Sequence, residues 1–463
     1  MSGIGCTGYQ QAMLGRRAFL GASIGGLTLP TILEARERTA EVTGRAPPDT
    51  AVIQYWLGGA ASHIETYDPK PSAPSEFRGS FRAIPTNIPG LQICETLPMH
   101  AKIMDKVTII RSMHHDNSDH QHGHHWCQTG HDAKANGANP FKRSSHPSVG
   151  SVTAKLRGAN VPGLPPYVHI GYQLDQHPGR YLPHGAAYIG RQYEPYIVLN
   201  QRTGDGKDPG LDSDFRVRNL QLSATLTPDI IRHRQRLLIQ LDALRRNVGP
   251  SEQMQALDQY SQAALEMVTG AAGSAFDLEK EDRQTHERYG ETRPGQTALM
   301  ARRLVEAGVT FVTVVDPGVG MSNSGWDMHK KIEWGMTTAC PRMDRAVTAL
   351  IEDLHQRGLD KKVLLVVWGE FGRTPRINEN AGRDHWAGVQ SLLVAGGGLR
   401  AGGLIGSSTA KGEVPKDRPL WPYDMIATIY RHLGVDPHQM QVNHAGRPVP
   451  LLERGAPIRE LVS

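Results

Sequence analysis

Six short apolar runs lie along the chain and predict the strands of a buried sheet. They cover residues 52–57, 107–111, 167–170, 309–315, 363–368 and 391–395. The runs are rich in β-branched residues and are nearly continuous rather than alternating with polar positions, which is the pattern of strands covered on both faces. The pattern therefore favours a largely parallel sheet with helices packed on it.

Helical periodicity appears between and after these runs. One apolar face, ending before Gly358, is formed by Met343, Val347, Leu350, Ile351 and Leu354. Residues 426–433 repeat the pattern before Gly434. Strands that alternate with helices predict an α/β fold.

The segment 200–290 differs from the rest because it is polar and has no strand signal. Two helices are predicted in it, one opening at Thr227-Pro228-Asp229 and one at Ser251. We interpret this segment as a helical insertion or cap on a main domain that covers residues 46–463. Residues 1–45 form a separate N-terminal signal and linker, and no internal repeat is visible.

Composition narrows the class of protein. The 463 residues are 39% hydrophobic, enough for a core, so wholesale disorder is excluded. The net charge is only +5, which argues against a nucleic-acid binder that works by bulk charge. Four scattered cysteines, at positions 6, 94, 127 and 340, exclude a disulfide scaffold and a CxxC zinc ribbon.

The N-terminal residues 15–33, GRRAFLGASIGGLTLPTIL, resemble a twin-arginine export signal. Arg16-Arg17 precede Phe19-Leu20, and the apolar stretch is too short for a spanning helix of about 20 residues. The resemblance implies a partner, the twin-arginine translocase, and a periplasmic or cell-surface location. No clean A-x-A cleavage site follows, so retention as an N-terminal anchor stays open, as does an ordinary basic helix start.

Histidine is the unusual residue of this chain. Seven of its 21 histidines lie within residues 114–131: His114, His115, His120, His122, His124, His125 and His131. Ligands of open α/β sheets bind beyond the carboxyl ends of the strands. Four predicted strands are followed by metal-ligating side chains, and the candidates are His63, Glu65, His122, Asp327, His329, Glu370, Asp384 and His385. Imidazole with carboxylate suits zinc, manganese or iron, and carboxylates suit calcium, so the identity of the divalent metal stays open.

Each candidate also has a structural interpretation. The histidine-rich segment alone is compatible with a solvated loop that binds metal adventitiously. Glu370 ends the most hydrophobic run and needs a partner, which is either a cation or Arg373. Cys127 is either a thiolate ligand or, more often for such a residue, a small buried side chain. Arg111, Arg373 and Arg383 lie near the same strand ends and could bind an anionic ester bidentately or pair at the surface.

Long motifs from about residue 50 to the C-terminus resemble the DUF1501 family of bacterial proteins. They include WLGGAASHIETYDPKP, GQTALMARRLVEAGVTFVTV and GEFGRTPRINENAGRDHW. Two further segments, LPMHAKIMDKVTIIRS and YDMIATIYRHLGVDP, resemble sulfatases. The resemblance implies twin-arginine export and a three-layer α/β/α sandwich of the alkaline phosphatase and sulfatase type, with metal ligands at the strand ends.

The same resemblance suggests positions for the site. Glu370 stands where sulfatases have the aspartate of a late motif, and His63 and Glu65 stand where the first-strand acidic ligands lie. Asp327, His329 and His385 are matched to the other half of the metal site. However, no C/S-x-P-x-R or Asp-Ser-Ala motif is present. The nucleophile position falls near His120, flanked by Ser118 and His122.

Two functions are therefore expected. The first is an exported metal-dependent hydrolase of sulfate or phosphate esters, with a sulfated polysaccharide as one candidate substrate. In it, Arg111 or Arg373 would offset the anionic charge, and Ser118 or a metal-activated water would attack. The second is a non-catalytic exported metal-binding or surface-assembly protein, which the missing nucleophile motif favours. A redox metalloprotein is weaker because haem and iron–sulfur motifs are lacking.

Overall fold

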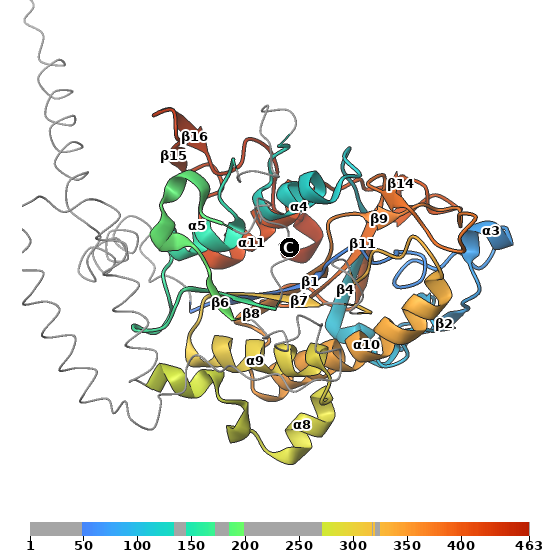
Figure 1. The fold of residues 1–463 in the computed structure, drawn as a ribbon, viewed down its shortest axis with the longest axis horizontal. Helices are drawn as coiled ribbons and strands as arrows, with labels where there is room; N and C mark the ends of the chain where they lie inside the picture. The colour runs from blue at the N-terminus through green and yellow to red at the C-terminus, as the bar shows by residue number, and fades with distance from the viewer. Residues whose placement is uncertain are drawn as a thin grey trace, which may run out of the picture.

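The computed structural model describes residues 49–133, 145–171, 185–198, 271–316, 318–319 and 325–462. An eight-stranded sheet crosses the molecule in the order β12-β4-β11-β8-β1-β7-β5-β6 (Figure 1). Its strands are β1 (Ala51–Leu57), β4 (Val107–Met113), β5 (Tyr167–Ile170), β6 (Tyr196–Val198), β7 (Phe311–Asp316), β8 (Val363–Trp368), β11 (Gln390–Gly396) and β12 (Gly403–Ile405). All six apolar runs thus form strands of this one sheet.

The sheet is largely parallel, as the apolar runs predict. Strand β1 pairs in parallel with β7 and β8, so Trp56 lies opposite Val315 on one side and Trp368 on the other. Only β11 runs against both of its neighbours, β4 and β8. The carboxyl ends of β1, β4, β7 and β8 consequently meet at one edge of the sheet.

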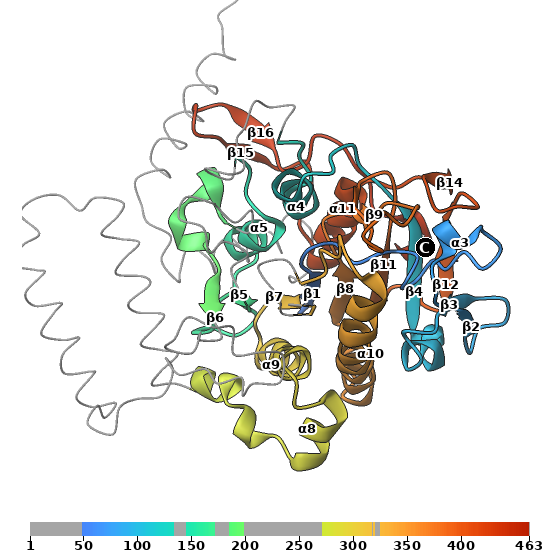
Figure 2. The same cartoon turned by 45° about the vertical axis from the view of Figure 1, so that its right-hand side comes forward.

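Helices cover both faces of the sheet (Figures 1 and 2). Helices α8 (Arg283–Tyr289), α9 (Arg293–Ala307) and α10 (Ile332–Gln356) lie on one face, and α4 (His120–Thr129), α5 (Val149–Leu156) and α11 (Pro422–Leu433) on the other. Side chains alternate between the two faces of a strand. Ile53 and Tyr55 of β1 therefore belong to the hydrophobic core beneath α9 and α10, whereas Val52 and Trp56 belong to the core beneath α11. The predicted three-layer α/β/α fold is confirmed.

Smaller elements surround the sheet edges. They are α3 (Ser75–Arg78), α12 (Arg459–Val462) and the two-stranded pairs β2 (Ala83–Pro85) with β3 (Gln92–Cys94), β9 (Gly372–Arg373) with β10 (His385–Trp386), β13 (Ser407–Ser408) with β14 (Pro415–Asp417), and β15 (Met440–Val442) with β16 (Pro448–Pro450). Short 3₁₀ helices cover His100–Lys102, Met104–Lys106, Ala187–Ile189, Arg191–Tyr193, Ala271–Phe276 and Leu278–Lys280.

Of the described helices, α10 and α11 were predicted and both begin earlier than expected, whereas α4, α5 and α9 were not predicted. Helix α10 begins at Ile332, because Ile332, Met336 and Ala339 extend its buried face toward the N-terminus. Helix α11 ends where expected, with Gly434 in the left-handed conformation that closes a helix.

Several predictions fall outside the described residues. These are the twin-arginine signal and the two helices expected after Thr227 and Ser251. The described part of the expected insertion, residues 271–290, packs on the main domain: Tyr289 of α8 donates its hydroxyl to Asp353 of α10 at 3.0 Å. Among the described residues, no helix is both long enough and apolar enough to cross a membrane.

Candidate metal centre

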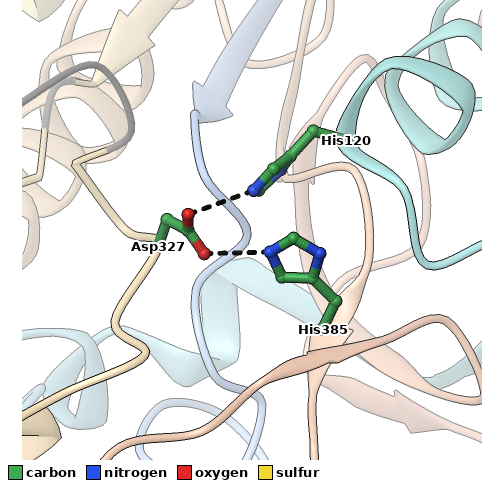
Figure 3. A group of neighbouring side chains, drawn as sticks. All are labelled: His120, Asp327 and His385. Carbon is green, nitrogen blue, oxygen red and sulfur yellow. Dashed lines mark hydrogen bonds and ion pairs between the residues drawn. The ribbon is translucent and has the colours of Figure 1, made fainter.

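Three side chains from distant parts of the chain converge at the carboxyl edge of the sheet (Figure 3). His120 begins α4, Asp327 lies in the loop after β7, and His385 belongs to β10. One potential ligand atom from each lies within 4.8 Å of the others. We call these three residues, with the adjacent His329, the histidine–aspartate cluster.

Local sequence explains why His120 reaches the cluster. Asp119 caps α4 by accepting hydrogen bonds from the Gln121 and His122 amides at 3.1 and 3.2 Å, so the helix starts at His120. Gly123, one turn later, has no side chain to hold α4 away from β8. A Cβ at Gly123 would lie 3.0 Å from the Glu370 carbonyl oxygen.

The short ribbon β9–β10 positions the opposite wall. His385 pairs with Arg373 across this ribbon. The fully buried Arg373 guanidinium donates to Asp327 Oδ1 and to the carbonyls of Gly59 and Ala60. Arg373 therefore fixes the aspartate relative to both the ribbon and the end of β1.

All three histidines of the cluster share one arrangement. On the Nδ1 side, His120 meets Glu370 Oε1 at 2.7 Å, His329 meets Asp384 Oδ1 at 2.6 Å, and His385 meets the Ser118 carbonyl at 2.9 Å. On the Nε2 side, all three face the Asp327 carboxylate, at 3.2, 3.0 and 3.1 Å respectively. An oxygen partner at one ring nitrogen orients a metal-ligating histidine and directs the other nitrogen to the ion.

The charges of the cluster are strongly coupled. Burial lowers the pKa of His120, but hydrogen bonds and attraction to Asp327 and Glu370 outweigh burial and raise the pKa to about 9. Burial raises the pKa of Asp327, yet hydrogen bonds from His120 and His385, together with the Arg373 charge, hold it well below the usual range. Both carboxylates that face His120 are thus ionised at neutral pH.

The donor set fits a divalent metal ion. Three imidazole nitrogens and one carboxylate are the ligands that zinc takes in tetrahedral sites, and manganese and iron accept them too. Glu370 adds a second observation, because its Oε2 is buried and has no hydrogen-bond partner among the described residues. A buried carboxylate oxygen without a partner is costly, and a cation nearby would relieve that cost.

Comparison with known proteins identifies the family. The model of the family described as "Protein of unknown function (DUF1501)" matches residues 49–462. The chain belongs to the DUF1501 family. No curated protein sequence matches it.

Three solved structures are among those similar to this DUF1501 chain. PsFucS1 sulfatase from Pseudoalteromonas sp. is 11% identical, with 87% of this chain and 71% of that chain covered and a TM-score of 0.38. The phosphonate monoester hydrolase SpPMH from Silicibacter pomeroyi is 11% identical, with 89% and 76% covered and a TM-score of 0.38. The C-terminal periplasmic domain of EcEptC from Escherichia coli, in complex with Zn, is 10% identical, with 88% and 89% covered and a TM-score of 0.35.

The structure brings together residues from three of the four predicted strand-end segments. The two candidate ligands that follow β1, His63 and Glu65, lie outside the cluster. Glu65 is buried and held by Arg383, whose Nη2 and Nε donate to it at 2.6 and 2.9 Å, and by the Ser62 hydroxyl. His63 is buried and faces the Gly412 carbonyl at 2.9 Å. In this DUF1501 chain, His63 and Glu65 therefore bind other protein groups and do not belong to the cluster.

Of the four expected catalytic residues, only His120 belongs to the cluster, and Ser118, Arg111 and Arg373 bind other protein groups. The Arg373 guanidinium is occupied by Asp327 and backbone carbonyls, and Arg111 donates to the carbonyls of Tyr67 and Gln92. Ser118 accepts a hydrogen bond from the Ala387 amide at 2.9 Å. Both arginines thus hold the DUF1501 fold together near the strand ends.

The remaining candidates surround the cluster. His122 pairs with Asp119 on the exposed side of α4, and Asp384 orients His329. Cys127 is fully buried against the Glu370 carbonyl, and burial raises the pKa of its thiol.

Sequence reasoning missed Asn378. Its Nδ2 donates to the His329 carbonyl at 3.1 Å and to Asp384 at 3.2 Å. Its only signal is the turn sequence NENAG, residues 378–382, which runs into RDHW.

Proposed function

We propose that this protein is an exported metal-dependent hydrolase of sulfate or phosphate esters. One observation carries the proposal. Three histidine Nε2 atoms converge on the single carboxylate of Asp327, and the Nδ1 atom of each ring faces an oxygen atom that orients the ring. We assign His120, Asp327, His329 and His385 as the residues that hold a divalent ion. Such an ion supplies Lewis-acid polarisation of an ester oxygen.

The surrounding side chains support this assignment. Arg373 keeps Asp327 ionised and in place, and Asp384 holds the His329 ring in place. Glu370 offers a buried carboxylate beside His120, with one oxygen free of partners among the described residues. We place the reacting ester at the exposed side of the cluster, where His329 and His385 are 39% and 25% exposed.

A second candidate function is supported by the arginines. Arg111 and Arg373 were expected to receive the anionic group, and both are bound to protein atoms. A metal-binding or surface-assembly protein without catalysis needs no such group. We therefore retain this function as the alternative to hydrolysis.

Export remains a proposal from the sequence. The RR-x-F-L segment would direct the folded chain, with its ion, to the twin-arginine translocase and then to the periplasm or cell surface. Fusion of residues 1–48 to a folded reporter tests this proposal. Export that is lost when Arg16-Arg17 become Lys-Lys supports it, and export that persists contradicts it.

The hydrolase proposal is tested with protein purified together with its own metal. We expect 4-nitrophenyl sulfate or 4-nitrophenyl phosphate to be hydrolysed, and His385→Ala or Asp327→Asn to lower the rate at least about 100-fold. The control is His438→Ala, which removes an exposed histidine outside the cluster. A metal-loaded protein that turns over neither ester contradicts hydrolysis and favours the non-catalytic alternative.

A further inference from the structure

A small aromatic pocket is lined in part by α4, the helix that begins at His120. Its volume is about 280 Å³, and Trp126, Trp421 and Tyr423 line it. The Trp421 and Tyr423 rings are stacked with centroids 5.7 Å apart and planes at 9°, and Trp126 lies 5.7 Å from Trp421. The volume is at the lower end for small-molecule sites, so the pocket suits a group the size of one ring.

The pocket and the metal centre share one stretch of chain. Trp126 is six residues after His120 on α4, roughly 9 Å along the helix axis. Ring contacts join the two sites: Trp126 lies 5.3 Å from His115, His115 lies 6.5 Å from Phe371, and Phe371 lies 5.1 Å from His120. Helix α11, which begins next to Trp421, packs against α4 on the same face of the sheet (Figure 2).

The charged residues of the pocket are mainly acidic. Among the described residues, Asp116, Asp132 and Glu453 line it together with Arg454. These four side chains leave a net negative charge, so a sulfated or phosphorylated group would be repelled there. Carboxylates instead accept hydrogen bonds from hydroxyl or ammonium groups.

We infer that this pocket is a saccharide subsite that takes one uncharged or amino-sugar ring. A sugar ring presents C–H bonds on its faces, which pack on Trp421 and Tyr423, and hydroxyl groups at its edge, which reach the carboxylates. The inference rests on the proposed function in one respect, namely that this ring belongs to the ester substrate. The ester group itself lies at the metal centre, outside the acidic pocket.

The test is a binding measurement on the full chain, by ligand-observed saturation-transfer NMR with glucose, glucosamine and glucose 6-sulfate. We expect glucose and glucosamine to bind and glucose 6-sulfate to bind at least about fivefold more weakly. Tyr423→Ala should weaken binding about five- to tenfold, whereas Tyr423→Phe keeps the ring and should bind within about twofold of the native chain. Trp334→Ala is the matched control, because Trp334 is 51% exposed on α10 and does not line the pocket.

Three results would overturn the subsite: no binding of either neutral or amino sugar, tighter binding of the sulfated sugar, or equal losses in Tyr423→Phe and Tyr423→Ala. His385→Ala separates this inference from the proposed function. It should abolish ester hydrolysis and leave sugar binding unchanged. Hydrolysis without sugar binding by the native chain refutes the subsite alone, and sugar binding without hydrolysis refutes the hydrolase alone.

Discussion

The Nε2 atoms of His329 and His385 lie 2.9 Å apart, and both face Asp327 Oδ1. The Nδ1 atom of each ring has its own oxygen partner, so the two Nε2 atoms converge on the same carboxylate oxygen. A cation between the two rings would take both Nε2 atoms and Asp327 as ligands. The proposed metal centre depends on that cation.

Asp384→Asn should weaken zinc binding about 10–100-fold and leave the fold intact. Asp384 orients His329 from 2.6 Å and is half exposed, so its loss affects ring orientation more than packing. Zinc affinity by competition with a chelator measures the effect. Asp360→Asn provides the control, because Asp360 faces His355 in another aspartate–histidine pair. Equal losses in the two variants would argue against an orienting role.

Arg373→Lys should lower the free energy of unfolding by about 2–4 kcal/mol. The guanidinium reaches Asp327 and three backbone carbonyls, those of Gly59, Ala60 and Arg383, and a single ammonium group cannot replace this planar set of donors. Urea denaturation followed by circular dichroism measures the change. A difference below about 0.5 kcal/mol would show that the guanidinium does not hold this loop.

Glu65→Gln distinguishes a structural carboxylate from a metal ligand. The pair of Glu65 and Arg383 is buried, and the substitution leaves the Arg383 charge uncompensated, so we expect a loss of about 3 kcal/mol in stability. The metal content of the folded protein should not change. Loss of the metal with unchanged stability would restore Glu65 to the ligand set.

His63 should make the fold sensitive to mild acid. Burial lowers its pKa to about 4, against 6.5 for an ordinary histidine, so the unfolded chain binds the proton more tightly. The contribution of His63 to the free energy of unfolding is fully present above pH 6.5. It falls as the pH drops from 6.5 to 4, by up to about 1.4 kcal/mol per pH unit. His63→Gln keeps a donor for Gly412 and cannot be protonated. Its unfolding free energy should fall less than that of the native chain between pH 7 and pH 4.5, and parallel pH profiles would contradict this role.

Much of the fold could be predicted from the sequence. Continuous apolar runs marked the sheet strands, because strands buried on both faces have few polar positions. The antiparallel direction of β11 could not be predicted, because a run of apolar residues does not show whether its strand pairs in parallel or antiparallel. Helix α10 also begins earlier than its clearest periodicity indicated.

The site was less predictable, because its contacts join residues far apart in the sequence. His120, Asp327 and His385 could each be suggested from their residue types near strand ends. That Arg383 pairs with Glu65, 318 residues earlier, depends on how the loops cross above the sheet. The same holds for Arg373, whose donors are taken up by Asp327 and backbone carbonyls before any anion could reach them.

The most direct test of the central claim is anomalous X-ray diffraction from crystals of protein purified with its own metal. We expect one strong peak, at about 2.0–2.2 Å from the Nε2 atoms of His120, His329 and His385 and from an Asp327 oxygen. A peak held only by other histidines of residues 114–131, or no peak between these four side chains, would contradict the proposed metal centre.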